Sequence, residues 1–318
     1  MPSFSIIIPV KPGGDVAALP YLRDLDSPYP FEVLVAEGCR PSRQRNAAVR
    51  ESRGEFLYFL DDDSLVFPAS LNIFANAMED PAVAVAGGPS LTPAGDSHLQ
   101  QLFGSALASM FGAGAVRNRY RAVGALRETT DRELILCNLA MRRDVFLSLG
   151  GFDERLYPNE ENELLDRVLA SGLKLVHIPQ MGVQRSQRKT LSQFVRQMFS
   201  YGRGRAEQSL ISGSVSVVSF APLVFFVYLV LLFFVPLNSL VLAPLIVYLV
   251  LDVIFSISAV LTSGSESRTL LLFLFPLIHL ANGCGLLWGL AGGVRGISRG
   301  TPEGVAVKRI KTFEQALW

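Results

Sequence analysis

The feature that most constrains the fold of this chain is the uneven distribution of its charged residues. Lys, Arg, Asp and Glu make up 18% of the 318 residues, yet residues 215–293 contain almost none of them. That stretch holds three apolar runs, at about 215–235, 240–261 and 269–292. Each run is as long as the roughly 20 residues that a helix needs to span a lipid bilayer. The sequence therefore predicts a polar N-terminal domain followed by transmembrane helices.

These features divide the chain into four expected parts. Residues 1–188 form an α/β domain, and residues 189–213 are basic and amphipathic. That composition is typical of a helix lying on a membrane surface, although a surface helix packed on the protein core has the same pattern. Residues 214–293 hold the transmembrane helices, and residues 294–318 form a basic tail.

The orientation of the membrane segment stays open. The N-terminus lacks the basic stretch of a signal peptide, so we expect a multi-pass protein of the inner (cytoplasmic) membrane with its α/β domain in the cytoplasm. Three crossings would place the tail on the opposite side, but its basic residues favour the cytoplasm. Either one run does not cross or the tail is an exception, and we favour three helical segments. The basic residues of the tail are Arg295, Arg299, Lys308, Arg309 and Lys311.

The polar part alternates apolar, strand-like runs with polar, helix-like ones. Strands are expected at 4–10, 31–36 and 56–60, with a helix at about 42–50 between the last two. Strand, helix and strand in succession imply parallel pairing with a right-handed crossover. The carboxyl ends of such strands meet at one edge of the sheet, where open α/β folds bind ligands. Further helices are expected at 69–78, 142–149 and 160–171, and further strands at 83–86, 138–141 and 175–178.

Three consecutive acids, Asp61, Asp62 and Asp63, end the apolar run 56–60. Their mutual repulsion needs a counter-charge, and carboxylate oxygens suit Mg²⁺ or Mn²⁺ carrying a phosphorylated substrate. Alternatively, the acids cap the following segment by accepting hydrogen bonds from free backbone N–H groups. A second acidic cluster, Glu160, Glu161 and Glu163, can supply a general base or simply stabilise a helix N-terminus.

Several motifs occur together in this chain. They are Ser5-Ile6-Ile7-Ile8-Pro9-Val10; Arg45-Asn46-Ala47 leading through Gly54-Glu55 to Leu60-Asp61-Asp62-Asp63; Gly150-Gly151-Phe152-Asp153; Glu160-Glu161-Asn162-Glu163-Leu164 with Arg167; and Gln197 with Tyr201-Gly202-Arg203-Gly204-Arg205. As a set they resemble the family 2 inverting glycosyltransferases with the GT-A fold. The resemblance is to membrane-anchored bacterial members that act in exopolysaccharide or glycolipid assembly, and it covers about residues 3–206.

The resemblance implies roles for individual residues, matched motif by motif. The metal, Mn²⁺ or Mg²⁺, falls to Asp63 together with Asp61. Glu161 stands at the position of the general base, with Glu160 as its rival. The nucleotide-binding residues are Pro9, Lys11, Glu37, Arg45, Asp61 and, by supporting the turn, Asp62. The residues on the acceptor and diphosphate side are Gly150, Gly151, Glu163, Arg167, Gln197, Tyr201, Arg203 and Arg205.

The sequence departs from the family pattern in three places. Glu161 replaces the usual Asp, and Glu37 stands where Asp is common. The family often has a metal-ligating His just after its last strand, but here Val183-Gln184-Arg185 contains none. A metal would then rest on Asp63, phosphates and water, or Arg185 could replace part of its charge.

The resemblance implies an inverting transfer of sugar from a nucleotide sugar, UDP-linked, to a lipid-linked acceptor such as a polyprenyl phosphate or a glycolipid. The transfer is expected to be metal-assisted, with a carboxylate base, at the cytoplasmic membrane face. The alternatives are a processive polysaccharide synthase and an inactive membrane scaffold that binds nucleotide or lipid. The net charge of +1 gives no argument for a nucleic-acid partner.

Overall fold

The computed structural model describes residues 1–213, 217–263, 266–293 and 304–315. The described residues divide into two compact units. The first unit draws on Met1–Pro93, Asn118–Ser186 and Ser298–Trp318, and the second on Ala94–Arg117 and Gln187–Ile297. The C-terminal tail therefore belongs with the α/β part of the chain, whereas residues 94–117 belong with the apolar helices.

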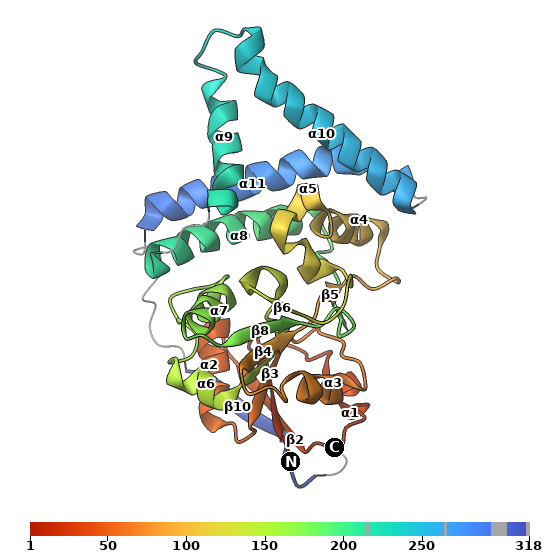
Figure 1. The fold of residues 1–318 in the computed structure, drawn as a ribbon, viewed down its shortest axis with the longest axis vertical. Coiled ribbons are helices and arrows are strands. Elements are labelled where there is room, and N and C mark those ends of the chain that lie inside the picture. Colours follow the sequence, from red (N-terminus) through yellow and green to blue (C-terminus); the bar gives the residue numbers. More distant parts are fainter. Residues whose placement is uncertain (214–216, 264–265, 294–303, 316–318) are drawn as a thin grey trace. The chain divides into compact units, whose positions relative to one another are not determined.

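Within the described residues, eight strands of the first unit form one sheet in the order β10-β2-β1-β3-β7-β4-β8-β6, and β5 pairs with β9 in a smaller sheet (Figure 1). The strands are β1 (Phe4–Val10), β2 (Phe31–Glu37), β3 (Phe56–Leu60), β4 (Val83–Gly87), β5 (Ser90–Leu91), β6 (Arg127–Thr129), β7 (Asn138–Arg142), β8 (Lys174–His177), β9 (Val183–Gln184) and β10 (Ala306–Lys311).

Pairing in the large sheet is mixed. β1 pairs parallel with both β2 and β3, as the strand-helix-strand pattern predicted. β7 lies antiparallel between β3 and β4, and β10 lies antiparallel to β2. The predicted α/β class is thus confirmed, and the carboxyl ends of β1, β2 and β3 share one edge of the sheet.

Helices cover both faces of this sheet. One layer is α1 (Leu19–Arg23) with α3 (Ser70–Ala77), and the other is α2 (Pro41–Glu51), α6 (Arg143–Ser148) and α7 (Glu160–Ala170). Alternate residues of each strand point to opposite faces. Ile6 of β1 therefore packs in the core that contains Phe74 of α3, while Ile7 packs in the core that contains Leu164 of α7. Burial on both faces explains why the central strands are continuous apolar runs.

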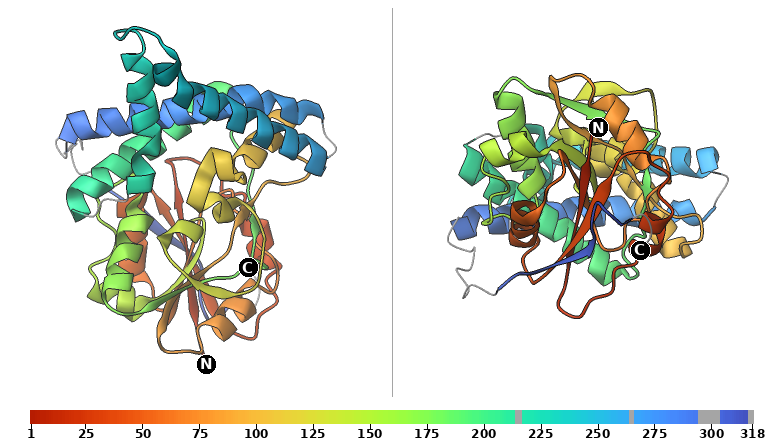
Figure 2. Two further views of the ribbon diagram at one scale, coloured as in Figure 1. Left: turned by 45° about the horizontal axis from the view of Figure 1, so that its top comes forward. Right: turned by 90° about the horizontal axis from the view of Figure 1, so that it is seen from below.

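The second unit is helical (Figure 2). Its helices are α4 (His98–Leu107), α5 (Met110–Ala113), α8 (Leu191–Ser212), α9 (Ala221–Leu231), α10 (Ser239–Ser263) and α11 (Leu271–Gly292), with 3₁₀ turns η3 (Val217–Phe220) and η4 (Glu266–Leu270). Two further 3₁₀ turns are η1 (Gly114–Tyr120), which begins in the second unit and ends in the first, and η2 (Asp131–Glu133), which belongs to the first unit. The sequence of residues 90–135 has no clear apolar period, yet α4 within it begins with a capping box between Ser97 and Gln100.

Two helices of the described chain are long and apolar enough, by length and composition, to cross a membrane. They are Ser239–Thr262 and Ser267–Gly292, which match the second and third predicted spans. The first predicted run gives only the shorter helix Val217–Leu231, because the chain turns before Pro236, a residue type that disfavours continued helix. Two of the three predicted runs thus meet the criteria of length and composition among the described residues. Residues 214–216 of that run lie outside the described residues.

Glycines allow α8 and α11 to lie side by side (Figures 1 and 2). A Cβ atom added at Gly202 of α8 would lie 2.1 Å from the carbonyl oxygen of Asn282, and one added at Gly285 of α11 would lie 2.0 Å from that of Phe199. Both distances are far below contact, so the two backbones touch directly. The segment predicted as a surface helix therefore buries one face against protein, including Phe194 and Met198.

The pairing of β10 with β2 limits the membrane topologies that the chain could have if its apolar helices cross a membrane. Arg309 of β10 pairs with the buried Glu32 of β2, and Lys311 Nζ donates to the Phe31 carbonyl at 2.8 Å. The chain thus leaves the α/β unit at Ser186 and returns to the same sheet. If the apolar helices between these points cross a membrane, an even number of crossings is consistent with this return to the sheet. The predicted tail residues Arg295 and Arg299 lie outside the described residues.

We expect Gly285→Ala to lower the free energy of unfolding by about 1–3 kcal/mol, because its methyl group forces α8 and α11 apart. Gly292→Ala is the matched control, since a Cβ there meets no described atom within 4 Å, and alanine favours a helix over glycine by up to about 1 kcal/mol. Thermal unfolding of the purified protein in detergent, followed by circular dichroism, measures both. Equal midpoints for the two variants would contradict the direct contact.

Candidate active site

The acid triplet lies in a tight turn directly after β3. The backbone N–H of Asp61 donates to Ser64 Oγ at 3.2 Å, and the N–H of Ser64 donates to the Asp61 carbonyl at 3.1 Å. The Asp62 carbonyl accepts from the N–H of Ala18 at 3.0 Å, which ties this turn to the loop after β1. Burial, then repulsion from Asp63 and Asp61, raises the pKa of Asp62.

Arg45 of α2 connects the two acidic clusters that the sequence had singled out. Its Nη2 lies 2.7 Å from Asp61 Oδ1, and its Nη1 lies 3.0 Å from Glu160 Oε1 at the start of α7. The Arg45 side chain is only 4% exposed. A buried arginine is stable when carboxylates pair with it, so this residue fixes both clusters at one place.

A second guanidinium, that of Arg185, binds Asp61 through its other oxygen and also binds Asp63. Its Nε lies 2.6 Å from Asp63 Oδ1, and its Nη2 lies 3.1 Å from Asp61 Oδ2. Each oxygen of Asp61 therefore faces a different arginine. The sequence had placed Arg185 after the last strand only as a possible source of charge.

Glu160 and Glu161 occupy different environments although they are neighbours. Burial, together with repulsion from Glu161 and against the attraction of Arg45, raises the pKa of Glu160 to about 8. Glu161 is more exposed, and its Oε1 lies 3.6 Å from Arg119 Nη1. Arg119 also donates to Asn162 and to the Asp131 carbonyl, so it is held in place. No sequence signal pointed to Arg119, because it lies in the region without a pattern.

Glu37 ends β2 beside the loop that follows β1. Its Oε1 accepts from the N–H of Gly13 at 3.0 Å, and its Oε2 lies 3.2 Å from Lys308 Nζ of β10. The Gly13 hydrogen bond and then Lys308 lower the pKa of Glu37. Pro9 is buried in β1, and Lys11 is exposed in the loop that follows. Because Val10 of β1 pairs with Glu37 of β2, the predicted nucleotide-binding residues Pro9, Lys11 and Glu37 lie close together. Lys308 had been assigned only to a tail.

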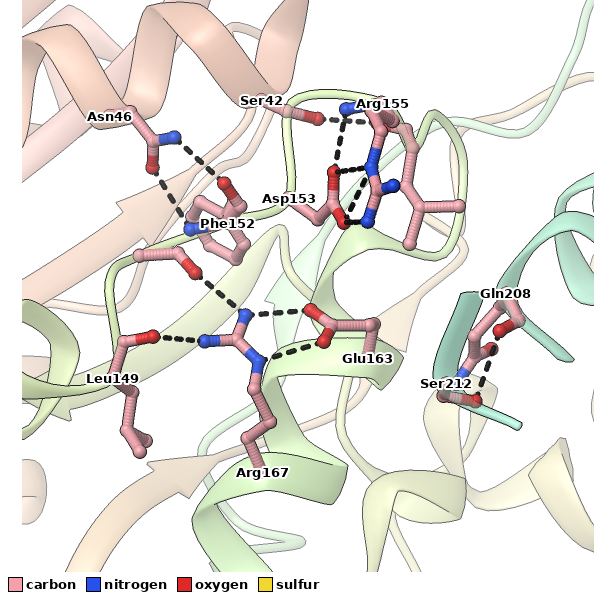
Figure 3. Close-up of polar contacts among 12 residues, drawn as sticks. Ser42, Asn46, Leu149, Phe152, Asp153, Arg155, Glu163, Arg167, Gln208 and Ser212 are labelled. Atoms are coloured by element: carbon pink, nitrogen blue, oxygen red, sulfur yellow. Dashed lines mark hydrogen bonds and ion pairs between the residues drawn. The ribbon is translucent and has the colours of Figure 1, made fainter. Parts of the chain in front are cut away.

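Glu163 and Arg167 of α7 stabilise the turn at Gly150 and Gly151 (Figure 3). Arg167 forms two hydrogen bonds to Glu163, at 2.7 and 2.6 Å, and donates to the carbonyls of Leu149 and Gly151. Both glycines have positive φ, +84° and +76°, which side chains rarely adopt. The four predicted residues form one cluster that holds the start of α7 in place.

The other predicted acceptor-side residues lie on α8, in the helical unit. Gln197 Nε2 donates to Tyr201 Oη at 2.7 Å, and Arg203 Nε lies 3.5 Å from Glu207 Oε1. Arg205 donates to Gln208 Oε1 at 3.1 Å, and Gln208 in turn accepts at its carbonyl from Ser212 (Figure 3). These contacts all lie within one helix.

The carboxylates present fit a divalent ion that takes few protein ligands. No group of three or more His, Cys, Asp or Glu residues suitable for a metal occurs among the described residues. Asp61 is engaged by Arg45 and Arg185, whereas Asp63 is 45% exposed and contacts Arg185 through Oδ1. Because Mg²⁺ needs only one or two carboxylates and takes its remaining ligands from water and phosphate, Asp63 is the residue that would hold it.

The fold and the site define the class of protein. The mixed α/β sheet is GT-A-like, and the aspartate turn after β3 and the glutamates at the start of α7 lie where the resemblance to nucleotide-sugar transferases predicted acidic groups. A model of the family described as glycosyl transferase family group 2 matches residues 56–289. The chain belongs to this family. It is a glycosyltransferase that takes its sugar from a nucleotide-sugar donor.

Similarity to one solved structure supports the fold, and a second match is weaker. The chain is similar to the mannosyltransferase PcManGT from Pyrobaculum calidifontis, solved with GDP-Man and Mn²⁺, at 14% identity and a TM-score of 0.54 over 90% of this chain and 87% of that one. Residues 1–349 of S. aureus TarS, solved with UDP-GlcNAc, match at 14% identity and a TM-score of 0.46 over 89% of this chain and 90% of that one. No curated protein sequence matches the chain.

The raised pKa of Glu160 predicts a pH-dependent stability. Between about pH 4.5 and pH 8 the folded protein holds a proton at Glu160 that the unfolded chain has released, so stability falls as pH rises. We expect Glu160→Gln to flatten this dependence. Thermal unfolding midpoints of the wild type and the variant, measured across that pH range, provide the test. The control is Glu128→Gln, because the Glu128 side chain is 65% exposed. Parallel curves for the wild type and Glu160→Gln would refute the assignment.

Proposed function

We propose that this glycosyltransferase inverts the anomeric carbon of a UDP-linked sugar by single displacement, and that the acceptor is lipid-linked, such as a polyprenyl phosphate or a glycolipid. The observation that supports the proposal most strongly is the Arg45 side chain, which joins Asp61 to Glu160. Through it, the donor-binding turn is joined to the start of α7, where Glu160 is followed by the candidate base Glu161.

On the donor side, Glu37 with the loop from Pro9 to Lys11 binds the nucleobase, while Arg45, Asp61 and the turn at Asp62 position the rest of the nucleotide. A divalent ion, Mn²⁺ or Mg²⁺, would be held mainly by Asp63 beside Asp61. When bound, it neutralises charge that develops on the leaving diphosphate. Asp63 suits this role because its carboxylate is half-exposed.

On the acceptor side, Glu161 takes the proton of an acceptor hydroxyl group, such as that of a glycolipid, as its oxygen attacks the anomeric carbon; the oxygen of a phosphate acceptor is already ionised and attacks without this proton transfer. The bond from that carbon to the diphosphate oxygen breaks, and the nucleoside diphosphate leaves with the electron pair. Glu161 suits this role better than Glu160, because the Glu160 carboxyl is buried and bonded to Arg45. Arg119 near Glu161 keeps a positive charge beside the candidate base.

The remaining predicted residues complete the proposal. Gly150, Gly151, Glu163 and Arg167 shape the acceptor side by fixing the start of α7. The α8 residues Gln197, Tyr201, Arg203 and Arg205 bind the acceptor or the diphosphate. Residues 1–188 act as the catalytic domain, 189–213 as the segment next to the membrane and 214–293 as the membrane domain.

The two long apolar helices support a location at the inner (cytoplasmic) membrane, with the α/β unit on the cytoplasmic face. Polar acceptors on lipid carriers reach an enzyme anchored in this way without leaving the bilayer. Two membrane-spanning helices are too few to line a channel for a growing polysaccharide. We therefore favour the transfer of a single sugar over a processive synthase. The glutamate pair and the acid turn also count against an inactive scaffold.

With a hydroxyl acceptor such as a glycolipid, we expect Glu161→Gln to reduce kcat by about 10²- to 10⁴-fold, the usual contribution of a general base, while binding of the nucleotide is retained. The assay uses the full chain in lipid with a panel of UDP-sugars, Mn²⁺ and polyprenyl phosphate or glycolipid acceptors. GDP-mannose joins the panel because the similar mannosyltransferase was solved with it.

Glu128→Gln is the control for that assay, since its exposed side chain lies outside the proposed machinery. If Glu161→Gln stays fully active while Glu160→Gln does not, the base is Glu160 instead. If no sugar nucleotide is consumed by the wild type with any acceptor, the proposed acceptor class is wrong.

A separate prediction concerns the crossing of the membrane. With two spans, α10 and α11, the α/β unit and Asn238 lie on one side and Ser267 lies on the other. In a variant without the native cysteines Cys39, Cys137 and Cys284, we expect Asn238→Cys to react with an impermeant maleimide added on the α/β side. Ser267→Cys should react only from the opposite side. Labelling of both from the same side would show that the helices do not span.

A further inference from the structure

Two arginines balance part of the negative charge of the acid turn. Asp61 Oδ1 and Oδ2 lie 2.7 Å from Arg45 and 3.1 Å from Arg185, respectively. Arg185 also contacts Asp63 at 2.6 Å. The Arg185 guanidinium therefore joins Asp61 and Asp63. A divalent ion held by both carboxylates would occupy the same position between them.

The backbone next to Arg185 is anchored, so the guanidinium does not depend on a loose surface loop. The Arg185 N–H donates to the Leu91 carbonyl at 2.9 Å, and Gln184 exchanges hydrogen bonds with Leu65, at 2.9 and 3.0 Å. Leu65 lies two residues after Asp63, which ties the segment that carries Arg185 directly to the acid turn. The Arg185 side chain is 22% exposed, compared with 45% for Asp63.

A guanidinium in this position can still bind a phosphate. Arginine has five N–H donors in a planar fork, and the two contacts with Asp61 and Asp63 use the Nε–H and one Nη2–H. The Nη1 edge remains for the bidentate contact that arginine makes with phosphate oxygens. Arg185 also brings a fixed positive charge that needs no reorganisation when the leaving group gains negative charge.

We propose that Arg185 contacts the diphosphate of the donor and supplies the positive charge that a metal bridging Asp61 and Asp63 would otherwise supply. A divalent ion at Asp63 then strengthens binding without being required for it. This inference rests on the proposed donor site. In the family that the sequence resembles, the position after the last strand often carries a metal-ligating histidine. Here that position holds Arg185, a cationic side chain that cannot bind a metal.

The test is the binding of UDP and GDP to the full-length protein in detergent, measured by calorimetry with Mn²⁺ and, separately, with a chelator. We expect the wild type to bind one of these nucleotides in the chelator with an affinity within about tenfold of that in Mn²⁺, a difference of about 1.4 kcal/mol. Arg185→Gln should lose about 10- to 100-fold of the metal-free affinity, as expected for a hydrogen bond with a charged group.

Further variants separate charge from structure. Arg185→Lys keeps the charge and should retain more metal-free affinity than Arg185→Gln. Arg185→His supplies a ligand, so nucleotide binding should depend on Mn²⁺, and Mn²⁺ binding by electron paramagnetic resonance should tighten. Arg50→Gln, which removes an exposed arginine of α2, is the charge-matched control. Circular dichroism confirms that each variant is folded.

The outcomes distinguish this inference from the proposed function. Wild-type binding that occurs only with Mn²⁺, or Arg185→Gln that binds like the wild type in the chelator, overturns the role of Arg185 and leaves the donor site in place. Absence of UDP and GDP binding under both conditions overturns the donor site and this inference together.

Discussion

The site depends on one buried side chain, that of Arg45, which forms an ion pair with Asp61 and donates a hydrogen bond to Glu160. These residues come from three different elements, the start of α2, the end of β3 and the start of α7. Removing one partner of a buried pair leaves an uncompensated charge, which costs about 3–5 kcal/mol. The same contacts that position the donor-binding turn and the glutamate cluster therefore also stabilise the α/β unit.

The main sequence predictions succeeded where burial controlled the pattern. The strands of residues 4–10, 31–36 and 56–60 are apolar because both of their faces are covered, so their composition revealed them and the acids that follow. The mixed pairing of the sheet was not predictable from the sequence, because β7 reaches its place between β3 and β4 only after a long excursion. Pairing of strands far apart in sequence leaves no local periodic signal.

The arginines that complete the site illustrate a second limit. Arg119 and Arg185 lie in a 3₁₀ turn and in a loop after β9, where no apolar period marks their neighbours. Lys308 lies in a basic segment that resembles a tail, yet its alternation of partly buried and exposed residues is that of an edge strand. A basic edge strand also protects a sheet from pairing with other chains. Charge alone suggested a membrane signal, and only tertiary contacts show the strand.

Electrostatics explains why a metal and Arg185 can act together. Five acids, Asp61, Asp62, Asp63, Glu160 and Glu161, lie around three guanidiniums, those of Arg45, Arg119 and Arg185. A diphosphate adds further negative charge, and burial makes unbalanced charge more costly than in water. Burial, and then repulsion from neighbouring acids, raises the pKa values of Asp62 and Glu160. Arg185 is therefore needed before the donor arrives, whereas a divalent ion can enter with the phosphates that it balances.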